Sequence, residues 1–201
     1  MPRTKRWGGV VAGDSLELVA AEVRGCVRCR LAESRTHAVP GHGAPDADLM
    51  LVGEAPGAKE DATGLPFQGL GGRFLDGQLA ALGVAREQVY VTSSNKCRPP
   101  KNRNPRPDEV AACAGYLDRQ MALVRPRVVV AMGGTAASRL HPEPWGRPVK
   151  VGALRGPPVL LGPDQSLVVT YHPAAAMRFP AQREPFAADL ATAVRLSGLG
   201  G

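Results

Sequence analysis

The chain has 201 residues, and its 25 Lys and Arg outnumber its 18 Asp and Glu, which gives a formal net charge of +7. This excess of positive charge favours an anionic partner such as nucleic acid. No segment reaches the roughly 20 apolar residues that a membrane span needs, and the start of the chain lacks the apolar stretch of a secretory signal. We therefore expect a monomeric cytoplasmic protein with one domain over residues 1–201, in which residues 1–14 and 198–201 are flexible ends.

Predicted helices and strands alternate along the chain. The strands are marked by short runs that are almost continuously apolar and rich in β-branched residues, as in a parallel sheet buried on both faces. In chain order we expect a helix over 15–26, a strand over 48–53, a helix over 71–83, a strand over 88–94, a helix over 107–125, a strand over 127–133, a short helix after GGTAASRL (133–140), a strand over 166–173 and a helix over 184–198. This alternation predicts an α/β fold, a three-layer α/β/α sandwich with a mostly parallel central sheet of about four strands.

The segments that follow the predicted strands carry most of the chemically distinctive residues. They are GEAPG (53–57), SSNKC (93–97), MGGT (132–135) and YHPAA (171–175). Because ligands of such sheets bind beyond the carboxyl ends of the strands, we expect these four segments to converge on one rim.

The first of these segments belongs to a dense stretch of glycines, prolines and acids, VGEAPGAKEDATGLPFQG (52–69). It lacks the Gly-Lys-Ser/Thr ending that a phosphate-binding loop uses for a nucleotide and its magnesium ion. It carries Glu54, Glu60 and Asp61 instead, together with a single aromatic residue, Phe67. The stretch is therefore a candidate site of a different kind.

The four cysteines predict a metal centre. Cys26 and Cys29 form a Cys-x2-Cys pair, and Cys97 and Cys113 lie far downstream. This set is typical of a tetrathiolate site, and the spacing does not distinguish zinc from an iron–sulfur cluster. The alternative is four buried thiols without a metal. Because Cys97 follows a predicted strand and Cys113 lies in a predicted helix, the centre would clamp the N-terminal segment against the sheet, in a structural role.

Several motifs together indicate a family. GEAPG with ED, TG and PF after it, then KCRPPKNR and a late YHPAA, with two cysteines near the start, keep a characteristic order and approximate spacing. In this combination the chain resembles a family 4 uracil-DNA glycosylase from about Cys26 to Arg178. The resemblance implies a structural [4Fe–4S] cluster, with zinc as the less favoured occupant. It also implies a DNA repair enzyme that hydrolyses the N-glycosidic bond of uracil in DNA and leaves an abasic site.

The resemblance further implies roles around the base. A base inside a duplex must be flipped out and stacked on a ring, and Phe67 matches the family's stacking phenylalanine. His172 matches the family histidine, which would stabilise the negative charge that develops on the departing base. Backbone groups of Glu54, Ala55 and Pro56 would line the base. The alternatives are ordinary core packing for Phe67 and a structural strand cap for His172.

Two further acids are candidates for the other half of the reaction. Either Glu60 or Asp61 would orient the attacking water or stabilise the cationic sugar, together with Glu54 as a catalytic carboxylate. The sequence does not decide which one does so. The alternative is that they are helix-capping or solvent-exposed acids.

One position departs from the family pattern. Where family members have an asparagine four residues before the third cysteine, this chain has Ser93, and an asparagine follows at Asn95. Residues two apart on a strand point to the same face but lie about 7 Å apart, so Asn95 is an imperfect substitute. A serine lacks the paired donor and acceptor of an amide. We therefore expect weaker or altered base selectivity, extending to other deaminated bases.

A basic, proline-rich loop, RPPKNRNPRP (98–107), is predicted to bind DNA. Cations beside the pocket suit phosphate contacts, which fix the position of the duplex and do not read its sequence. A solvated charged loop is the alternative. Beyond the histidine motif, a side chain from the AAAMRFP segment would wedge into the duplex in place of the flipped nucleotide. The predicted DNA-binding residues are Arg98, Lys101, Arg103, Arg106 and Arg178, and the candidate wedges are Met177, Arg178 and Phe179.

Two other functions compete with this hypothesis. The first is a non-catalytic or weakly active DNA- or lesion-binding iron–sulfur protein of the same fold, which would have lost turnover through Ser93. The second is a redox or zinc protein unrelated to DNA, which would leave GEAPG, Phe67 and His172 without an explanation.

Overall fold

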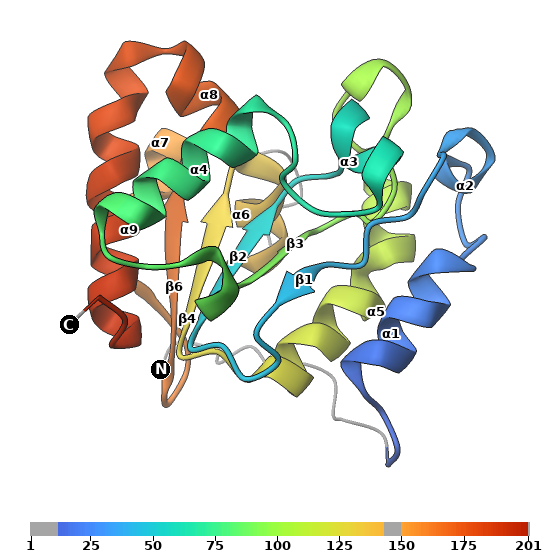
Figure 1. The fold of residues 1–201 in the computed structure, drawn as a ribbon, viewed down its shortest axis with the longest axis horizontal. Coiled ribbons are helices and arrows are strands. Elements are labelled where there is room, and N and C mark those ends of the chain that lie inside the picture. Colours follow the sequence, from blue (N-terminus) through green and yellow to red (C-terminus); the bar gives the residue numbers. More distant parts are fainter. Residues whose placement is uncertain (1–11, 143–149, 201) are drawn as a thin grey trace.

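The structure is a computed structural model that describes residues 12–142 and 150–200. Its described residues form one six-stranded sheet in the order β1-β3-β2-β4-β6-β5 (Figure 1). The four inner strands β3, β2, β4 and β6 are parallel to one another, and the edge strands β1 and β5 are antiparallel to their neighbours. The strands are β1 (His42–Gly43), β2 (Leu49–Gly53), β3 (Tyr90–Ser93), β4 (Val128–Met132), β5 (Val159–Gly162) and β6 (Gln165–Thr170).

The four inner strands confirm the predicted parallel sheet, because each coincides with one of the apolar runs. Every residue of β2, β3 and β4 is buried, as in a sheet covered on both faces. The two edge strands were not predicted. β1 has only two residues, and β5 is partly exposed, so neither carries the continuous apolar signal of an inner strand.

Nine helices and three short 3₁₀ turns are present in the described ranges. The stretch GGTAASRL is itself helical, which corrects the expectation of a helix after it. Its glycines form the start of the helix, where the chain leaves β4. The helices are α1 (Leu16–Arg24), α2 (Leu31–Ser34), α3 (Ala58–Thr63), α4 (Leu70–Ala81), α5 (Pro107–Val124), α6 (Gly134–Leu140), α7 (Val151–Leu154), α8 (Pro173–Arg178) and α9 (Arg183–Ser197). The 3₁₀ turns are Arg86–Gln88, Pro100–Asn102 and Pro180–Gln182.

Helices cover both faces of the sheet, which confirms the three-layer architecture (Figure 1). On one face, Leu75 of α4 and Phe186 of α9 pack in one core with alternate residues of the strands. On the other face, Leu117 of α5 and Leu140 of α6 share a second core with the remaining strand residues. Helix α1 lies outside these layers and packs against α5 through Val19, in a third cluster that contains the cysteines.

The described parts of the two chain ends, which are predicted to be flexible, contact the rest of the protein. The carboxylate of Asp14 forms an ion pair with Arg119 of α5 at 2.6 Å, and Leu199 packs against the core beside α9. The rest of the expected flexible ends, residues 1–11 and 201, lies outside the described residues. No helix in the described ranges is long and apolar enough to cross a membrane.

Candidate active site

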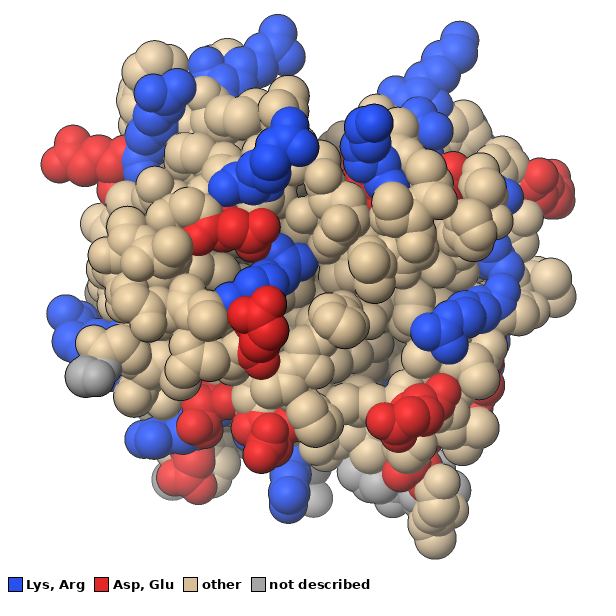
Figure 2. Space-filling view, in the orientation of Figure 1, with Lys and Arg blue, Asp and Glu red and all other residues tan. Residues whose placement is uncertain are grey.

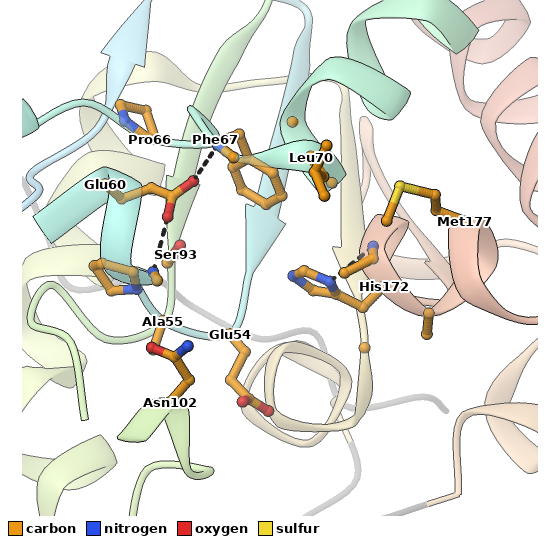
Figure 3. Close-up of a pocket in the computed structure, with 18 of the residues that line it drawn as sticks. Glu54, Ala55, Glu60, Pro66, Phe67, Leu70, Ser93, Asn102, His172 and Met177 are labelled. Atoms are coloured by element: carbon orange, nitrogen blue, oxygen red, sulfur yellow. Dashed lines mark hydrogen bonds between the residues drawn. The ribbon is translucent and has the colours of Figure 1, made fainter. Parts of the chain in front are cut away.

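The carboxyl ends of the parallel strands open into one cavity of about 1010 Å³ (Figure 3). Glu54 follows β2, Ser93 ends β3, Gly133 follows β4 and His172 follows β6, and all four residues line the cavity. Strands that run parallel in one sheet end at the same edge, so the segments after them meet there. The expected convergence of these segments is confirmed.

Phe67 lies in the cavity wall with a backbone conformation that non-glycine residues rarely adopt. Its φ is 56°, and the residue is only 8% exposed. The ring covers the end of β2 so closely that a Cβ on Gly53 would lie 2.6 Å from its Cζ atom. The Phe67 carbonyl packs against α4, where a Cβ on Gly72 would lie 1.7 Å from the carbonyl oxygen. A strained conformation persists where its surroundings enforce it, and two glycines make these close contacts possible.

His172 places a neutral hydrogen-bond donor beside the Phe67 ring. The two ring centroids are 5.8 Å apart with an interplanar angle of 23°, and both rings lie at the cavity (Figure 3). The backbone N–H of Ala174 donates to Nδ1 of His172 at 3.2 Å, so the ring proton of a neutral imidazole lies on Nε2. Burial lowers the pKa of His172 to about 4, and the charge of Glu60 opposes this shift. The imidazole is therefore neutral at pH 7 and donates through Nε2.

Two of the predicted carboxylates, those of Glu54 and Glu60, line the cavity and differ in how many hydrogen bonds they accept. The carboxylate of Glu54 accepts a hydrogen bond from the Thr135 hydroxyl of α6. The carboxylate of Glu60 accepts more hydrogen bonds, and these bonds join the start of α3 to the loop that carries Phe67 (Figure 3). It accepts backbone N–H bonds of 3.0, 2.7 and 2.9 Å from Gly57, Gln68 and Gly69.

The structure does not bring Asp61 or Asn95 to the cavity. Asp61 follows Glu60 on α3, and consecutive helical residues point about 100° apart. Its buried carboxylate accepts the N–H of Thr36 at 2.9 Å. The buried side chain of Asn95 donates from Nδ2 to the carbonyl of Glu109 at 2.9 Å. Asn95 is thus engaged by α5 and does not take the place of an asparagine at position 93.

The other predicted base contacts, Ala55, Pro56 and Ser93, all line the cavity. Ser93 is 6% exposed at the end of β3. A Cβ built on Gly53 would lie 3.4 Å from the Ser93 Oγ atom, so this hydroxyl lies close to the end of the neighbouring strand β2. Ser93, Gly53 and Phe67 therefore form one continuous part of the cavity wall.

In the basic loop, Arg103 is engaged by a buried carboxylate. Its guanidinium forms a bidentate ion pair with Glu109 of α5, at 2.7 and 2.8 Å, and the Glu109 side chain is fully buried. The hydrogen bonds from Arg103 and from the Arg106 backbone N–H lower the pKa of Glu109 to about 2, against the effect of burial. Arg103 thus fastens the loop to α5 while it lines the cavity.

The remaining loop cations are less constrained. Lys101 and Arg106 are exposed, and the Arg98 Nε atom donates to the side chain of Asn102 at 2.7 Å, which itself lines the cavity. Figure 2 shows Lys and Arg side chains that project along the upper edge of the molecule, the edge at which the parallel strands end in Figure 1. The loop therefore contributes positive charge beside the cavity mouth.

Three cations of the cavity lining were not predicted. Lys59 of α3, Arg73 of α4 and Lys150 line the cavity and are exposed. They are far apart in the sequence and lie in no basic run, so only the fold brings them together.

Apolar side chains lie on the α4 and α8 side of the cavity. Of the three candidate wedge residues, Met177 lines the cavity, while Phe179 is 50% exposed with the Arg178 guanidinium 5.5 Å from its ring centroid. Leu70, at the start of α4, was not predicted; it is 61% exposed and lies near Met177 (Figure 3). Leu70 and Met177 therefore add apolar surface to the cavity wall on the side of α4 and α8.

The cavity, with its phenylalanine, histidine and carboxylates, can be compared with known proteins. A family model described as "Uracil DNA glycosylase superfamily" matches residues 40–193. The chain belongs to this superfamily. It is 41% identical over 175 residues to the type-4 uracil-DNA glycosylase of Sulfurisphaera tokodaii, which covers 85% of this chain and 80% of that protein.

Two further relatives are similar over most of their length. A type-4 uracil-DNA glycosylase of Pyrobaculum aerophilum is 42% identical over 172 residues, covering 84% of this chain and 88% of the relative. A type-5 uracil-DNA glycosylase of Thermus thermophilus is 33% identical over 178 residues, covering 80% and 81%. The motif resemblance to the family is thereby confirmed.

In this superfamily member the four cysteines surround a second, small cavity. Cys26 and Cys29 come from the segment after α1, Cys97 from the segment after β3 and Cys113 from α5, and they form no disulfide. No set of three or more His, Cys, Asp or Glu side chains within the described residues is arranged to hold a single metal ion. The four thiols thus line one small cavity.

Hydrogen bonds reach three of these sulfur atoms. The backbone N–H of Arg28 donates to Cys26 at 3.5 Å, the Arg35 guanidinium donates to Cys97 at 3.0 Å, and a backbone N–H donates to Cys113 at 3.3 Å. Burial nevertheless raises the pKa of Cys97, and it raises that of Cys113 to about 11. Donors aimed at sulfur are suited to thiolates, whose charge burial alone would disfavour.

The Phe67 backbone is the feature of this site that a stability measurement can test. Gly72→Ala places a Cβ against the Phe67 carbonyl, and we expect it to lower the free energy of unfolding by about 1–3 kcal/mol because the cavity wall must shift. Gly77→Ala on the same helix meets nothing within 4 Å and should raise it by about 0.5–1 kcal/mol through helix propensity. Urea-induced unfolding measures both changes. Equal stability of the two variants would contradict the close contact.

Proposed function

We propose that this protein is a DNA repair enzyme that hydrolyses the N-glycosidic bond of uracil in DNA and leaves an abasic site. The observation that carries the proposal is the pairing of the Phe67 ring with a neutral, Nε2-protonated His172 in one cavity of a uracil DNA glycosylase superfamily member. A flipped base needs a ring to stack on and a donor for its carbonyl oxygen. These two residues supply both.

His172 would act on the leaving base. As the glycosidic bond breaks, negative charge develops on the uracil and positive charge on the sugar. The Nε2–H of His172, directed at a uracil carbonyl oxygen, stabilises the anion that forms in the transition state more than it stabilises the neutral base. The Ala174 N–H holds the imidazole in the tautomer that this step requires.

Glu54 is the carboxylate that we assign to the water and the cationic sugar. Both oxygens of Glu60 already accept backbone N–H bonds, so Glu60 shapes the Phe67 loop. Glu54 accepts one hydrogen bond, from the Thr135 hydroxyl, and it retains lone pairs for a water molecule. A negative carboxylate at this position also favours the positive charge on the sugar.

The cysteines fit a metal centre that joins the N-terminal segment to β3 and α5. Three sulfur atoms accept N–H hydrogen bonds, and the four cysteines line one small cavity, as expected of a tetrathiolate site. Cys26, Cys29, Cys97 and Cys113 would hold a [4Fe–4S] cluster. When bound, the cluster would cross-link the segments next to α1 and β3 with α5, and it would take no part in the reaction at the base.

DNA would lie across the cavity mouth. The exposed Lys59, Arg73, Lys101 and Arg106 would contact phosphates on both sides of the flipped nucleotide. Arg98 and Arg178 would add to these contacts, whereas Arg103 acts through its ion pair with Glu109 to hold the loop in place. Met177 or Phe179 would fill the gap that the flipped base leaves in the duplex. We further propose that the enzyme works as a cytoplasmic monomer.

The function is tested by a base-excision panel. Wild-type protein, incubated with oligonucleotides that carry uracil, hypoxanthine or xanthine in single- and double-stranded form, should produce alkali-labile abasic sites from uracil. His172→Ala should lower the single-turnover rate by about 10²–10³-fold, as expected for loss of one preorganised donor. His42→Ala, an exposed histidine outside the cavity, serves as the control and should keep the wild-type rate.

An intact rate in His172→Ala would refute the role of this histidine. If the wild type binds uracil-containing DNA tightly but forms no abasic product, the protein is a non-catalytic lesion-binding protein. This is the alternative in which turnover has been lost through Ser93.

The pKa of His172 predicts an unusual pH dependence. Because this pKa is lowered to about 4 from 6.5, the imidazole stays neutral as pH falls through 6.5 and becomes charged only near pH 4. The single-turnover rate at saturating DNA and constant ionic strength should therefore change by less than about twofold between pH 7.5 and 5.5 on account of this group. Between pH 6.5 and 4 this histidine binds a proton more readily in the unfolded chain than in the folded one. The free energy of unfolding should therefore fall as the pH is lowered through this window.

His172→Ala supplies the control for this stability loss, which should be smaller in the variant. A histidine-dependent fall in rate with a midpoint near pH 6.5 would show that the ring is not shielded as the structure places it.

Base selectivity should depend on Ser93. A serine hydroxyl offers one donor at this wall of the cavity, whereas an amide would pair with two groups on the uracil edge. Ser93→Asn should raise uracil excision relative to excision of hypoxanthine and xanthine by about tenfold or more. Ser94→Asn, at a buried neighbour outside the cavity lining, is the control for substitution at this strand end. An unchanged ratio of rates in Ser93→Asn would contradict the proposal.

A further inference from the structure

The turn between β4 and α6 contacts both side chains to which we assign the reaction. This turn is the segment MGGT (132–135). Gly133 has a φ of 95°, which favours glycine, and a Cβ on it would lie 3.4 Å from the Cβ atom of His172. Two residues later, the Thr135 hydroxyl donates to Oε2 of Glu54. The turn therefore touches the histidine through one residue and the carboxylate through another.

The Thr135 hydroxyl is directed away from its own helix. A threonine hydroxyl in a helix often donates to the carbonyl four residues before it, and Thr192 of α9 does so, to Ala188 at 3.0 Å. Thr135 is the second residue of α6, so the carbonyl four residues before it belongs to strand β4. Its hydroxyl reaches across to the end of β2 instead, where it meets Glu54.

The direction of the Glu54 side chain depends on this bond. The backbone of Glu54 is fixed after β2, where its carbonyl accepts the N–H of Asn95 at 3.0 Å. Its side chain is long and flexible and lies at a wide cavity. Within the described residues, the Thr135 hydroxyl is the one hydrogen-bond or ion-pair partner of its carboxylate. The bond engages Oε2 and leaves Oε1 to accept a hydrogen bond from a water molecule.

We propose that Thr135 is the positioning residue of Glu54, whose carboxylate it directs at the attacking water and the cationic sugar. The inference rests on the proposed function, in which Glu54 has this role. Thr135 is not part of the cavity lining, so it acts on the reaction through Glu54. A group on a packed helix holds its partner more precisely than a group on a loop does. Helix α6 is anchored in the core by Ala136, Ala137 and Leu140.

The test removes the hydroxyl and keeps the shape of the side chain. Thr135→Val should lower the maximal single-turnover rate of uracil excision by about 10–100-fold with unchanged affinity for DNA, because a misdirected carboxylate slows the reaction and leaves binding intact. Thr135→Ser keeps the donor and should stay within about threefold of the wild-type rate. Thr192→Val, the same change on α9 outside the cavity lining, is the matched control and should keep the wild-type rate.

A double-mutant cycle separates positioning from a general structural role. Glu54→Ala removes the side chain that Thr135 directs, and it should lower the rate by at least about 10²-fold. Thr135→Val added to Glu54→Ala should change the remaining rate by less than about twofold, because the hydroxyl then has nothing to position. A structural defect would instead slow both backgrounds equally.

The outcomes distinguish the inference from the proposed function. A wild type that forms no abasic site overturns the proposed function and the inference with it. A wild-type rate in Glu54→Ala overturns the role of Glu54 and the inference, and leaves the excision of uracil established. An intact rate in Thr135→Val, an equal loss in both backgrounds or a Thr135→Ser variant as slow as Thr135→Val overturns the inference alone.

Thr135→Ala is the second variant, for the case in which Thr135→Val does not fold. Thr135 is only partly buried, and alanine has a higher helix propensity than threonine or valine. This variant should lose about 10–100-fold in rate when Glu54 is present and less than about twofold in the Glu54→Ala background. Equal losses in the two backgrounds would overturn the inference here as well.

Discussion

The parallel pairing of β2, β3, β4 and β6 decides where every functional group of this protein lies. Gly53 at the end of β2 pairs with Ser93 at the end of β3, and Met132 of β4 pairs with Thr170 of β6. The strands therefore end together, and the segments beyond them form one cavity. β3 lies on one side of β2 and β4 on the other, so the chain changes direction at β2. Such a switch point opens a crevice in the sheet edge, and Glu54 stands at it.

This constraint explains why much of the fold and part of the site could be predicted from the sequence. Continuous apolar runs mark the inner strands, and the polar residue that follows each run is placed at the rim by topology alone. Glu54 and His172 could therefore be predicted as site residues, because each follows an inner strand. Phe67 was accessible because glycines and a proline surround it in a loop. Its left-handed backbone was not, since the conformation arises from contacts with Gly53 and with α4, distant along the chain.

What could not be predicted is which partner each polar side chain finds. Glu60 and Asp61 are adjacent in the sequence, yet one organises the Phe67 loop and the other is directed to Thr36. Asn95 matches the strand periodicity of Ser93 but is captured by the carbonyl of Glu109. Arg103 looked like any other loop cation until its buried partner was known. Local patterns specify an element and its faces, whereas these pairings depend on which surfaces the fold brings together.

One stripe of α5 joins the functional parts of the molecule. Glu109, Cys113 and Gln120 are spaced by four and seven residues, so they lie on the same side of the helix. Each serves a different part of the protein. Glu109 holds the basic loop through Arg103, and Cys113 lines the thiol cavity. The side-chain oxygen of Gln120 accepts a hydrogen bond from Nζ of Lys96. Two buried ionisable side chains meet at this stripe, Glu109 of α5 itself and Lys96 from the segment after β3. The Glu109 carboxylate pairs with the Arg103 guanidinium, whereas the Lys96 side chain donates to neutral oxygens of Thr92, Ser93 and Gln120 and so ties the end of β3 to α5.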